Sequence, residues 1–247
     1  MTYLEIKPHI LLQNYIDSYW CVKTGLIHQP MMIKLLPDGC IDIILNLGAD
    51  ILSENGNYVM KSGTATLVGT MTVFKNTFIQ NDTHLIGIRF KPLGFSAFYI
   101  YDSLHAITNK SIEFEKKLLP NIFPNNLEAK DILDGYFLEK LNQKYNPLRN
   151  ILSNINNYKG LITVDQLAKD NCISNRQLER NFKHFIGTSP KEYLNFVRYQ
   201  LALKMIKQRA GNRSLLDIAF ETGFYDHSHL TNQVKKRTGL PPSQFTA

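Results

Sequence analysis

One pattern of residues occurs twice in the last third of the chain, with the copies 52 positions apart. The first copy reads Phe182-Lys183-x-x-x-Gly187-x-x-Pro190-x-x-Tyr193, and the second reads Val234-Lys235-x-x-x-Gly239-x-x-Pro242-x-x-Phe245. Upstream, Leu167-Ala168 matches Ile218-Ala219 at 51 positions, which implies one extra residue in the turn of the second copy. The pattern therefore predicts two copies of one supersecondary unit.

Each copy carries the start and stop signals of two short helices joined by a tight turn. In the first copy, Thr163 can cap a helix over residues 164–169, and Ser174 can cap a second helix that runs to about residue 185 and ends at Gly187. In the second copy, Ser214 caps a helix over 215–221 and Asp226 caps the helix that follows. Both copies read as a helix-turn-helix.

The second helix of each copy has an apolar inner face and a polar outer face. Arg can bridge guanine, Asn and Gln can pair with adenine, and a helix fits the major groove of DNA. The same residues would also suit an ordinary solvated helix surface, but two copies in register favour DNA binding. The candidate DNA-binding residues are Asn175, Arg176, Gln177, Glu179, Arg180 and Lys183 in the first copy, and His227, Ser228, His229, Thr231, Asn232 and Lys235 in the second.

The net charge of the chain, +7, is unevenly distributed. Residues 1–147 hold 13 Lys and Arg against 14 Asp and Glu, whereas residues 148–247 hold 15 against 7. The excess positive charge thus lies in the part that contains the repeat, as expected if only that part faces phosphates.

A continuous helix is predicted between the two copies. Ser189-Pro190 is a helix start signal, and residues 191–207 contain no helix breaker. At 1.5 Å per residue this helix spans roughly 26 Å, so it could hold the two outer faces near one DNA turn apart, about 34 Å.

These residues resemble the DNA-binding domain of the AraC/XylS family of transcription regulators. The resemblance covers residues 151–245 and implies base reading by Arg176, Gln177, Glu179 and Arg180 in the first copy, with 227–229, 231 and 232 in the second. It rests on Leu167-Ala168, Ser174, Leu178, Arg180, Phe182-Lys183, Gly187, Ser189-Pro190, Tyr193, Arg198, Ala202, Ile218-Ala219, Gly223-Phe224, Leu230, Lys235-Lys236, Gly239, Pro242 and Phe245.

Two residues depart from the pattern of the family. Cys172 stands where the turn glycine is usual, and a residue with a Cβ at positive φ costs on the order of 1 kcal/mol. Val234 replaces a phenylalanine, which we expect to seat the second recognition helix less firmly.

The N-terminal part predicts a small antiparallel β-barrel followed by helices. We expect strands at 32–36, 40–47, 51–52, 58–60, 67–70, 73–80 and 84–90, and helices at 93–99, 113–119 and 127–144. The last helix could pair across a dimer or cover the barrel. Pro147 marks the predicted boundary, so the fold class is α+β, with domains at 1–147 and 148–247.

This part resembles the cupin-like N-terminal domain of some AraC-type regulators. The resemblance rests on Leu36-Pro37-Asp38-Gly39, Asp42, Asn46, Val68-Gly69 and Gly87-Ile88-Arg89-Phe90-Lys91-Pro92. In the family, such domains bind a small effector, form a homodimer, or both. Trp20, Asp42 and Arg89 are candidates for lining a ligand cavity, although packing and ion pairing could also account for them.

The histidines, the cysteines and the glycine-containing motifs of the sequence do not favour an enzyme or a cofactor site. His9, His28, His84 and His105 are widely scattered, which does not suit a metal-dependent cupin. Cys21 and Cys40 provide too few thiols for a repair alkyltransferase with a zinc cluster. We expect all three cysteines, including Cys172, to be buried. No Gly-rich phosphate loop or nucleophile elbow is visible.

The sequence therefore predicts a transcription regulator, an activator by resemblance. Its expected partners are double-stranded DNA, RNA polymerase and, where the N-terminal domain acts as a sensor, a small-molecule effector. No signal segment or membrane span is apparent, so we expect a cytoplasmic location. A DNA-binding protein that reads only the backbone and an enzyme tethered to DNA remain as alternatives.

Overall fold

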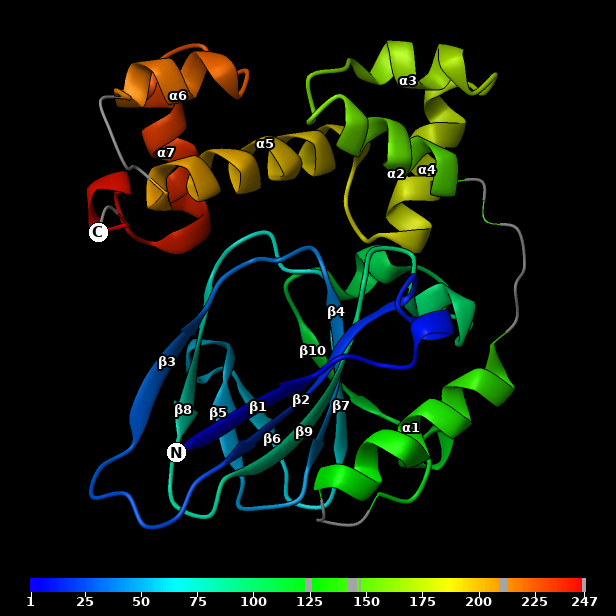
Figure 1. Ribbon diagram of the computed structural model, residues 1–247, viewed down its shortest axis with the longest axis vertical. Helices are drawn as coiled ribbons and strands as arrows, with labels where there is room; N and C mark the ends of the chain where they lie inside the picture. Colours follow the sequence, from blue (N-terminus) through cyan, green and yellow to red (C-terminus); the bar gives the residue numbers. More distant parts are fainter. Residues whose placement is uncertain (123–125, 142–145, 147, 209–212, 246–247) are drawn as a thin grey trace.

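The computed structural model describes residues 1–122, 126–141, 146, 148–208 and 213–245. Figure 1 shows an N-terminal part built mainly of strands and a C-terminal part built of helices, stacked on one another. No helix among the described residues is long and apolar enough to cross a membrane.

The strands of the N-terminal part are all paired antiparallel. Six of them form one sheet in the order β1-β2-β9-β4-β7-β10, while β3 pairs with β8 and β5 pairs with β6 in two separate ribbons. Their bounds are β1 Thr2–Ile6, β2 Ile16–Lys23, β3 Met31–Leu35, β4 Ile41–Asn46, β5 Ile51–Ser53, β6 Tyr58–Met60, β7 Ala65–Val68, β8 Lys75–Ile79, β9 His84–Phe90 and β10 Ser111–Phe114.

This arrangement agrees with the predicted antiparallel α+β fold but is not a closed barrel. Among the described residues, no ladder of hydrogen bonds joins the six-stranded sheet to the two ribbons. The edge strands of the sheet, β1 and β10, each pair on one side only. The ribbons face the sheet across a small apolar core that includes Trp20, Ile44 and Ile79.

Three strands escaped the sequence prediction. β1 and β2 were not predicted at all, because β2 is buried on both faces and so lacks the alternation that marks a half-buried strand. The helix predicted over 113–119 is wrong, because Ser111–Phe114 pairs with β7 as β10 and only the 3₁₀ turn Lys116–Leu118 follows. The helix predicted over 93–99 reduces to a 3₁₀ turn at Phe95–Ala97.

The helices follow the predicted start and stop signals closely in the C-terminal part. Ser174, Ser189 and Ser214 each accept a hydrogen bond from the backbone N–H three residues on, at 3.1 Å. The bounds are α1 Asn126–Lys140, α2 Leu148–Asn157, α3 Val164–Asp170, α4 Asn175–Phe185, α5 Pro190–Lys207, α6 Leu215–Glu221 and α7 His227–Thr238.

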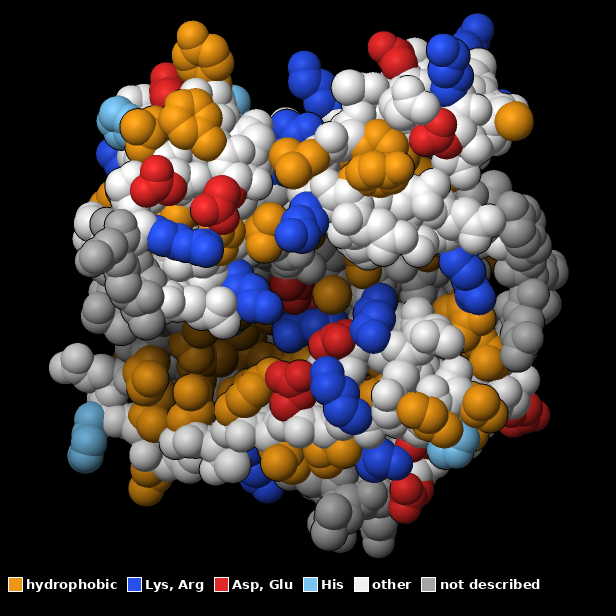
Figure 2. All heavy atoms as spheres, turned by 45° about the horizontal axis from the view of Figure 1, so that its top comes forward, with side chains coloured by type: hydrophobic (Ala, Val, Ile, Leu, Met, Phe, Trp, Pro, Cys, Tyr) orange, Lys and Arg blue, Asp and Glu red, His pale blue; other side chains and the backbone are white. Residues whose placement is uncertain are grey.

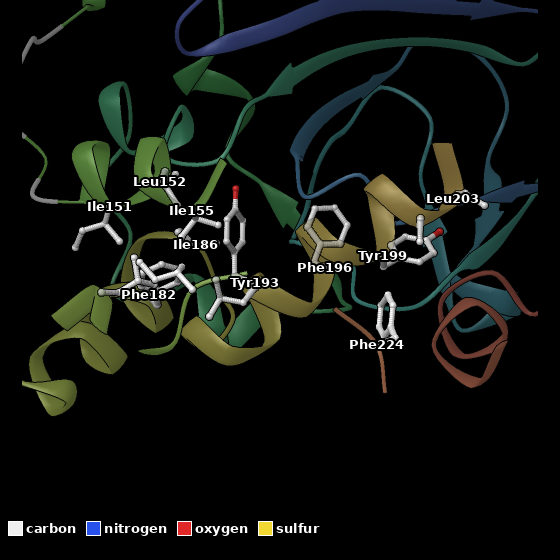
Figure 3. Packing of buried hydrophobic residues seen from close by; sticks show 14 of the residues in the cluster. Ile151, Leu152, Ile155, Phe182, Ile186, Tyr193, Phe196, Tyr199, Leu203 and Phe224 are labelled. Carbon is white, nitrogen blue, oxygen red and sulfur yellow. The ribbon is translucent and has the colours of Figure 1, made fainter. Parts of the chain in front are cut away.

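The two parts have separate hydrophobic cores. The larger N-terminal core includes Leu133 and Phe137 of α1, so this helix covers the sheet. Residues 142–144 of the predicted helix lie outside the described residues. The C-terminal core gathers around α5 and is built from residues 148–234 (Figure 3). We propose a domain boundary between these cores; the predicted marker, Pro147, lies outside the described residues.

The prediction that all three cysteines are buried is wrong. Cys21 is buried and Cys40 is half-buried, but Cys172 is exposed. Cys172 lies in the turn between α3 and α4 at φ 53°, while the equivalent Gly223 has φ 74°. The turn therefore needs a left-handed residue in both units, and in the first unit a side chain occupies that position.

Replacing Cys172 with glycine should stabilise the protein. The left-handed conformation costs a residue with a Cβ roughly 1–2 kcal/mol, and an exposed side chain loses little packing when removed. We expect Cys172→Gly to raise the free energy of unfolding by up to about 1 kcal/mol in urea titrations. Gly223→Cys should lower it, both through this strain and because the new Cβ would collide with Leu161. An unchanged unfolding midpoint in Cys172→Gly would contradict the strain argument.

Candidate nucleic-acid interface and ligand cavity

The first helix-turn-helix consists of α3 and α4. Leu178 and Phe182 of α4 are fully buried against the C-terminal core, which turns the opposite side of the helix outward. On that side Asn175, Arg176 and Arg180 are exposed. Gln177, Glu179 and Lys183 are half-buried along its margins.

Several of these side chains hold one another in place. Arg180 donates to Gln177 Oε1 at 2.5 Å, and Lys183 forms an ion pair with Glu179 at 3.1 Å, one turn away. Arg176 has no hydrogen bond or ion pair within the described part of the chain. Its guanidinium is the freest donor set on this face.

The second helix-turn-helix consists of α6 and α7. A capping box formed by Ser214 and Asp217 starts α6, and Asp226 starts α7 by accepting from the His229 backbone N–H at 2.7 Å. Val234, which is smaller than the phenylalanine usual at this position, is fully buried and packs α7 against the C-terminal core. The remaining predicted residues, His227, Ser228, His229, Thr231, Asn232 and Lys235, are exposed except for half-buried Thr231.

α5 places these two units at its opposite ends (Figure 1). It is 18 residues long, which corresponds to roughly 27 Å. None of the twelve predicted DNA-binding residues is buried, so every one of them is available to a partner. Tyr225, just before the N-terminus of α7, is also exposed and extends the polar face of the second unit. The sequence prediction did not include it among the DNA-binding residues.

Arg237 is a second residue that the sequence prediction missed. Near the C-terminus of α7 it would be expected to face solvent, yet its side chain is fully buried. It donates to Glu192 of α5 at 2.9 Å and to the backbone carbonyl of Thr72, in the N-terminal part, at 3.2 Å. No pattern in the sequence marks this contact, because it joins residues 165 positions apart.

The N-terminal part contacts the C-terminal ends of α4 and α7. These are the second helices of the two units, and we call them the recognition helices. Just after α4, Ile186 O accepts from Thr70 Oγ1 at 2.6 Å, and Gly187 O accepts from Thr108 Oγ1 at 2.6 Å. After α7, Gly239 lies so close to the Phe74 ring that a Cβ would collide with it. Both recognition helices are therefore docked on loops of the N-terminal part.

A cavity of about 430 Å³ lies between the sheet and the ribbon β3–β8. Trp20, Asp42 and Arg89, which the sequence singled out, all line it. Figure 2 shows this side of the molecule hollowed between the helices and the strands, with hydrophobic side chains in the hollow. The apolar lining includes Val22, Ile33, Leu35, Leu36, Ile44, Met60, Val68, Met71, Ile79 and Leu85.

The three predicted residues are joined to one another at one end of the cavity. Trp20 Nε1 donates to Asp42 Oδ1 at 2.8 Å, and Arg89 Nε lies 3.3 Å from that oxygen and 3.3 Å from Asp38 Oδ2. Burial raises the pKa of Asp42 to about 6, with Asp38 adding to the effect and Arg89 opposing it. The indole packs directly on Gly87, where any Cβ would strike the ring.

The fluorescence of Trp20 should therefore titrate near pH 6. Trp20 is the only tryptophan, and its indole N–H donates to a carboxyl group that is protonated below this pH and charged above it. We expect the emission of the wild-type protein to change with a midpoint near pH 6. Asp42→Asn should abolish the transition, and Asp38→Asn should lower its midpoint. A transition that persists in Asp42→Asn would refute the assignment.

Comparisons with protein families give one match in each part of the chain. Residues 167–247 match a helix-turn-helix domain family, and residues 4–113 match a domain of unknown function, DUF6597. The transcriptional regulator ArgR of Pseudomonas aeruginosa is 30% identical over 83 residues, which are 34% of this chain and 25% of that protein. A putative AraC-like regulator of Streptomyces lividans is 34% identical over 83 residues, 34% of this chain and 27% of that protein.

The chain thus spans about a quarter of the length of the curated relatives that it matches. Among solved structures, ToxT from Vibrio cholerae aligns over 99% of this chain and 98% of its own, with a TM-score of 0.51 and 10% identity. That likeness extends the shared fold to the N-terminal part. The C-terminal double helix-turn-helix of this chain thus matches a helix-turn-helix domain family and is similar to part of AraC-type transcription regulators.

Proposed function

We propose that this protein is a sequence-specific DNA-binding transcription regulator that responds to a small effector. The observation that carries the proposal is the pair of helix-turn-helix units at the two ends of α5, each with an exposed polar recognition face. The basic charge of residues 148–247 supports it, since phosphates attract that part of the chain.

The two recognition helices would enter successive major grooves on one side of the DNA. Arg176 and Arg180 are the candidates for bridging guanine, and Gln177 and Asn232 for pairing with adenine. Lys183 and Lys235, nearer the C-terminal ends of their helices, suit phosphate oxygens. The remaining members of the predicted set then lie along the same contacted surface.

The cavity lined by Trp20, Asp42 and Arg89 is the proposed effector site. The segment from residue 69 to 75 connects it to the DNA-binding part, because Met71 and Lys75 line the cavity while Thr70 and Thr72 bond the ends of α4 and α7. An effector that favours one position of this segment would change how the recognition helices are held.

The other expected partners follow from this role. We propose that this chain acts in the cytoplasm as an activator. In that role it would contact RNA polymerase and could bind DNA as a homodimer. We assign it no catalytic activity, since the relatives that it matches are regulators.

Mutations in the two kinds of contact should have different effects on DNA binding. Once genome-wide binding-site mapping has given the operator, Arg176→Ala or Arg180→Ala should cost about 1–3 kcal/mol and relax the preference at one base pair. Lys235→Ala should weaken binding to every sequence about equally and reduce the salt dependence. Electrophoretic titrations on the operator and on single-base variants measure both effects.

Two results would contradict this assignment. Uniform loss of affinity in the arginine variants would remove them from base reading. Equal affinity of the wild-type protein for the mapped operator and for random DNA would favour a protein that reads only the backbone, which is the alternative to a regulator.

A further inference from the structure

A second and larger cavity, of about 690 Å³, lies on the seam between the two parts of the protein. The N-terminal part contributes Tyr15, the segment 92–101 and Lys140 at the end of α1. The C-terminal part contributes one side of α2, with Arg149 and Leu152, and His184 and Phe185 in the last turn of α4. Its volume lies within the range of small-molecule sites, about 300–1,000 Å³.

The walls of this seam cavity are rich in aromatic side chains. Several of them pack on one another, as Phe98 does on Tyr15 at 5.9 Å between ring centroids. Such walls give flat apolar surfaces against which a planar group can stack. The aromatic lining residues are Tyr15, Phe95, Phe98, Tyr99, Tyr101 and Phe185.

Among the described residues that line the cavity, the side chains that carry a charge are basic. Lys140 and Arg149 line the cavity beside the His184 imidazole, and no described aspartate or glutamate does. Within the described part of the chain none of the three forms an ion pair with a carboxylate. The effector cavity differs, because Asp38 and Asp42 there are matched by Arg89.

Aromatic rings hold both cations, Lys140 and Arg149, in place. Lys140 Nζ lies 4.2 Å from the centroid of the Tyr99 ring and donates to Tyr136 Oη at 2.9 Å. Arg149 lies over the Tyr15 ring at 5.3 Å and donates to Tyr15 Oη at 2.8 Å. These contacts orient both groups without neutralising them, and most of their N–H donors stay available to a further acceptor.

We propose that the seam cavity binds a small anion with a flat apolar body, such as an aromatic carboxylate or sulfonate. The anionic group pairs with Arg149 and Lys140, since charge-assisted hydrogen bonds are the strongest polar contacts open to them. The body stacks among the aromatic walls. Because the lining comes from both parts of the chain, such a ligand stabilises their present arrangement, including the placement of α4.

The test uses two fluorescent probes with the same aromatic framework and different charge. The anionic probe is 8-anilino-1-naphthalenesulfonate, and the neutral probe is N-phenyl-1-naphthylamine. We expect the full-length protein to bind the anionic probe at least tenfold more tightly. In the double variant Lys140→Gln, Arg149→Gln the affinity for the anionic probe should fall to that for the neutral probe, because only the anionic probe pairs with the two cations. The affinity for the neutral probe should not change.

A matched variant separates the seam cavity from the effector cavity. Lys34→Gln removes a cation from the effector cavity and should leave the affinity for the anionic probe unchanged. Ala97→Trp fills the seam cavity and should weaken both probes. Thermal unfolding of each variant verifies that it is folded.

Two outcomes would overturn the proposal. One is equal affinity for the anionic probe in the wild-type protein and in a folded double variant. The other is loss of affinity in Lys34→Gln alone, which would place the probe in the effector cavity. No step of this test involves DNA, so its result is independent of the proposed regulatory function.

Discussion

Burial of α5 on nearly all of its sides is the constraint on which the rest of the structure depends. Pro190, Tyr193, Leu194, Phe196, Tyr199, Ala202, Leu203 and Ile206 are all buried, and together they do not form a single stripe. A helix that is apolar around most of its circumference must be covered by several neighbours. The two helix-turn-helix units supply part of that cover, with α2 and with Gly39 of the N-terminal part, which lies against Phe196. Each unit is thus positioned by packing against the same rigid element (Figure 3).

The burial of Arg237 extends this constraint to the N-terminal part. A buried guanidinium is tolerated only when partners replace its water, and here they are Glu192 Oε1 and the Thr72 carbonyl. The faces of Phe196 and Tyr199 lie 5.9 and 5.4 Å from its charged centre. Removal of any of these partners leaves a charge poorly compensated inside the protein. α5, α7 and the N-terminal loop are thus energetically linked.

The contacts at both recognition helices converge on neighbouring loops of the N-terminal part. Asn109 Nδ2 donates to Thr72 Oγ1 at 2.8 Å, which ties the loop that bonds Gly187 to the loop that bonds Arg237. The two loops are therefore held together by a direct side-chain hydrogen bond. The N-terminal part is thus in contact with both helix-turn-helix units, and Met71 and Lys75 of the same segment line the proposed effector cavity.

The C-terminal part and the faces that it exposes could be predicted from the sequence alone. Its signals there are local: Ser174, Ser189 and Ser214 cap helices within three residues, and the apolar spacing of α4 decides which side turns outward. It also singled out Trp20, Asp42 and Arg89, which do lie together. Only the tertiary structure decided the open sheet, strand β10, the burial of Arg237 and the seam cavity. Each of these features depends on contacts between residues far apart in the chain. Local propensity and hydrophobic periodicity carry no information about such contacts.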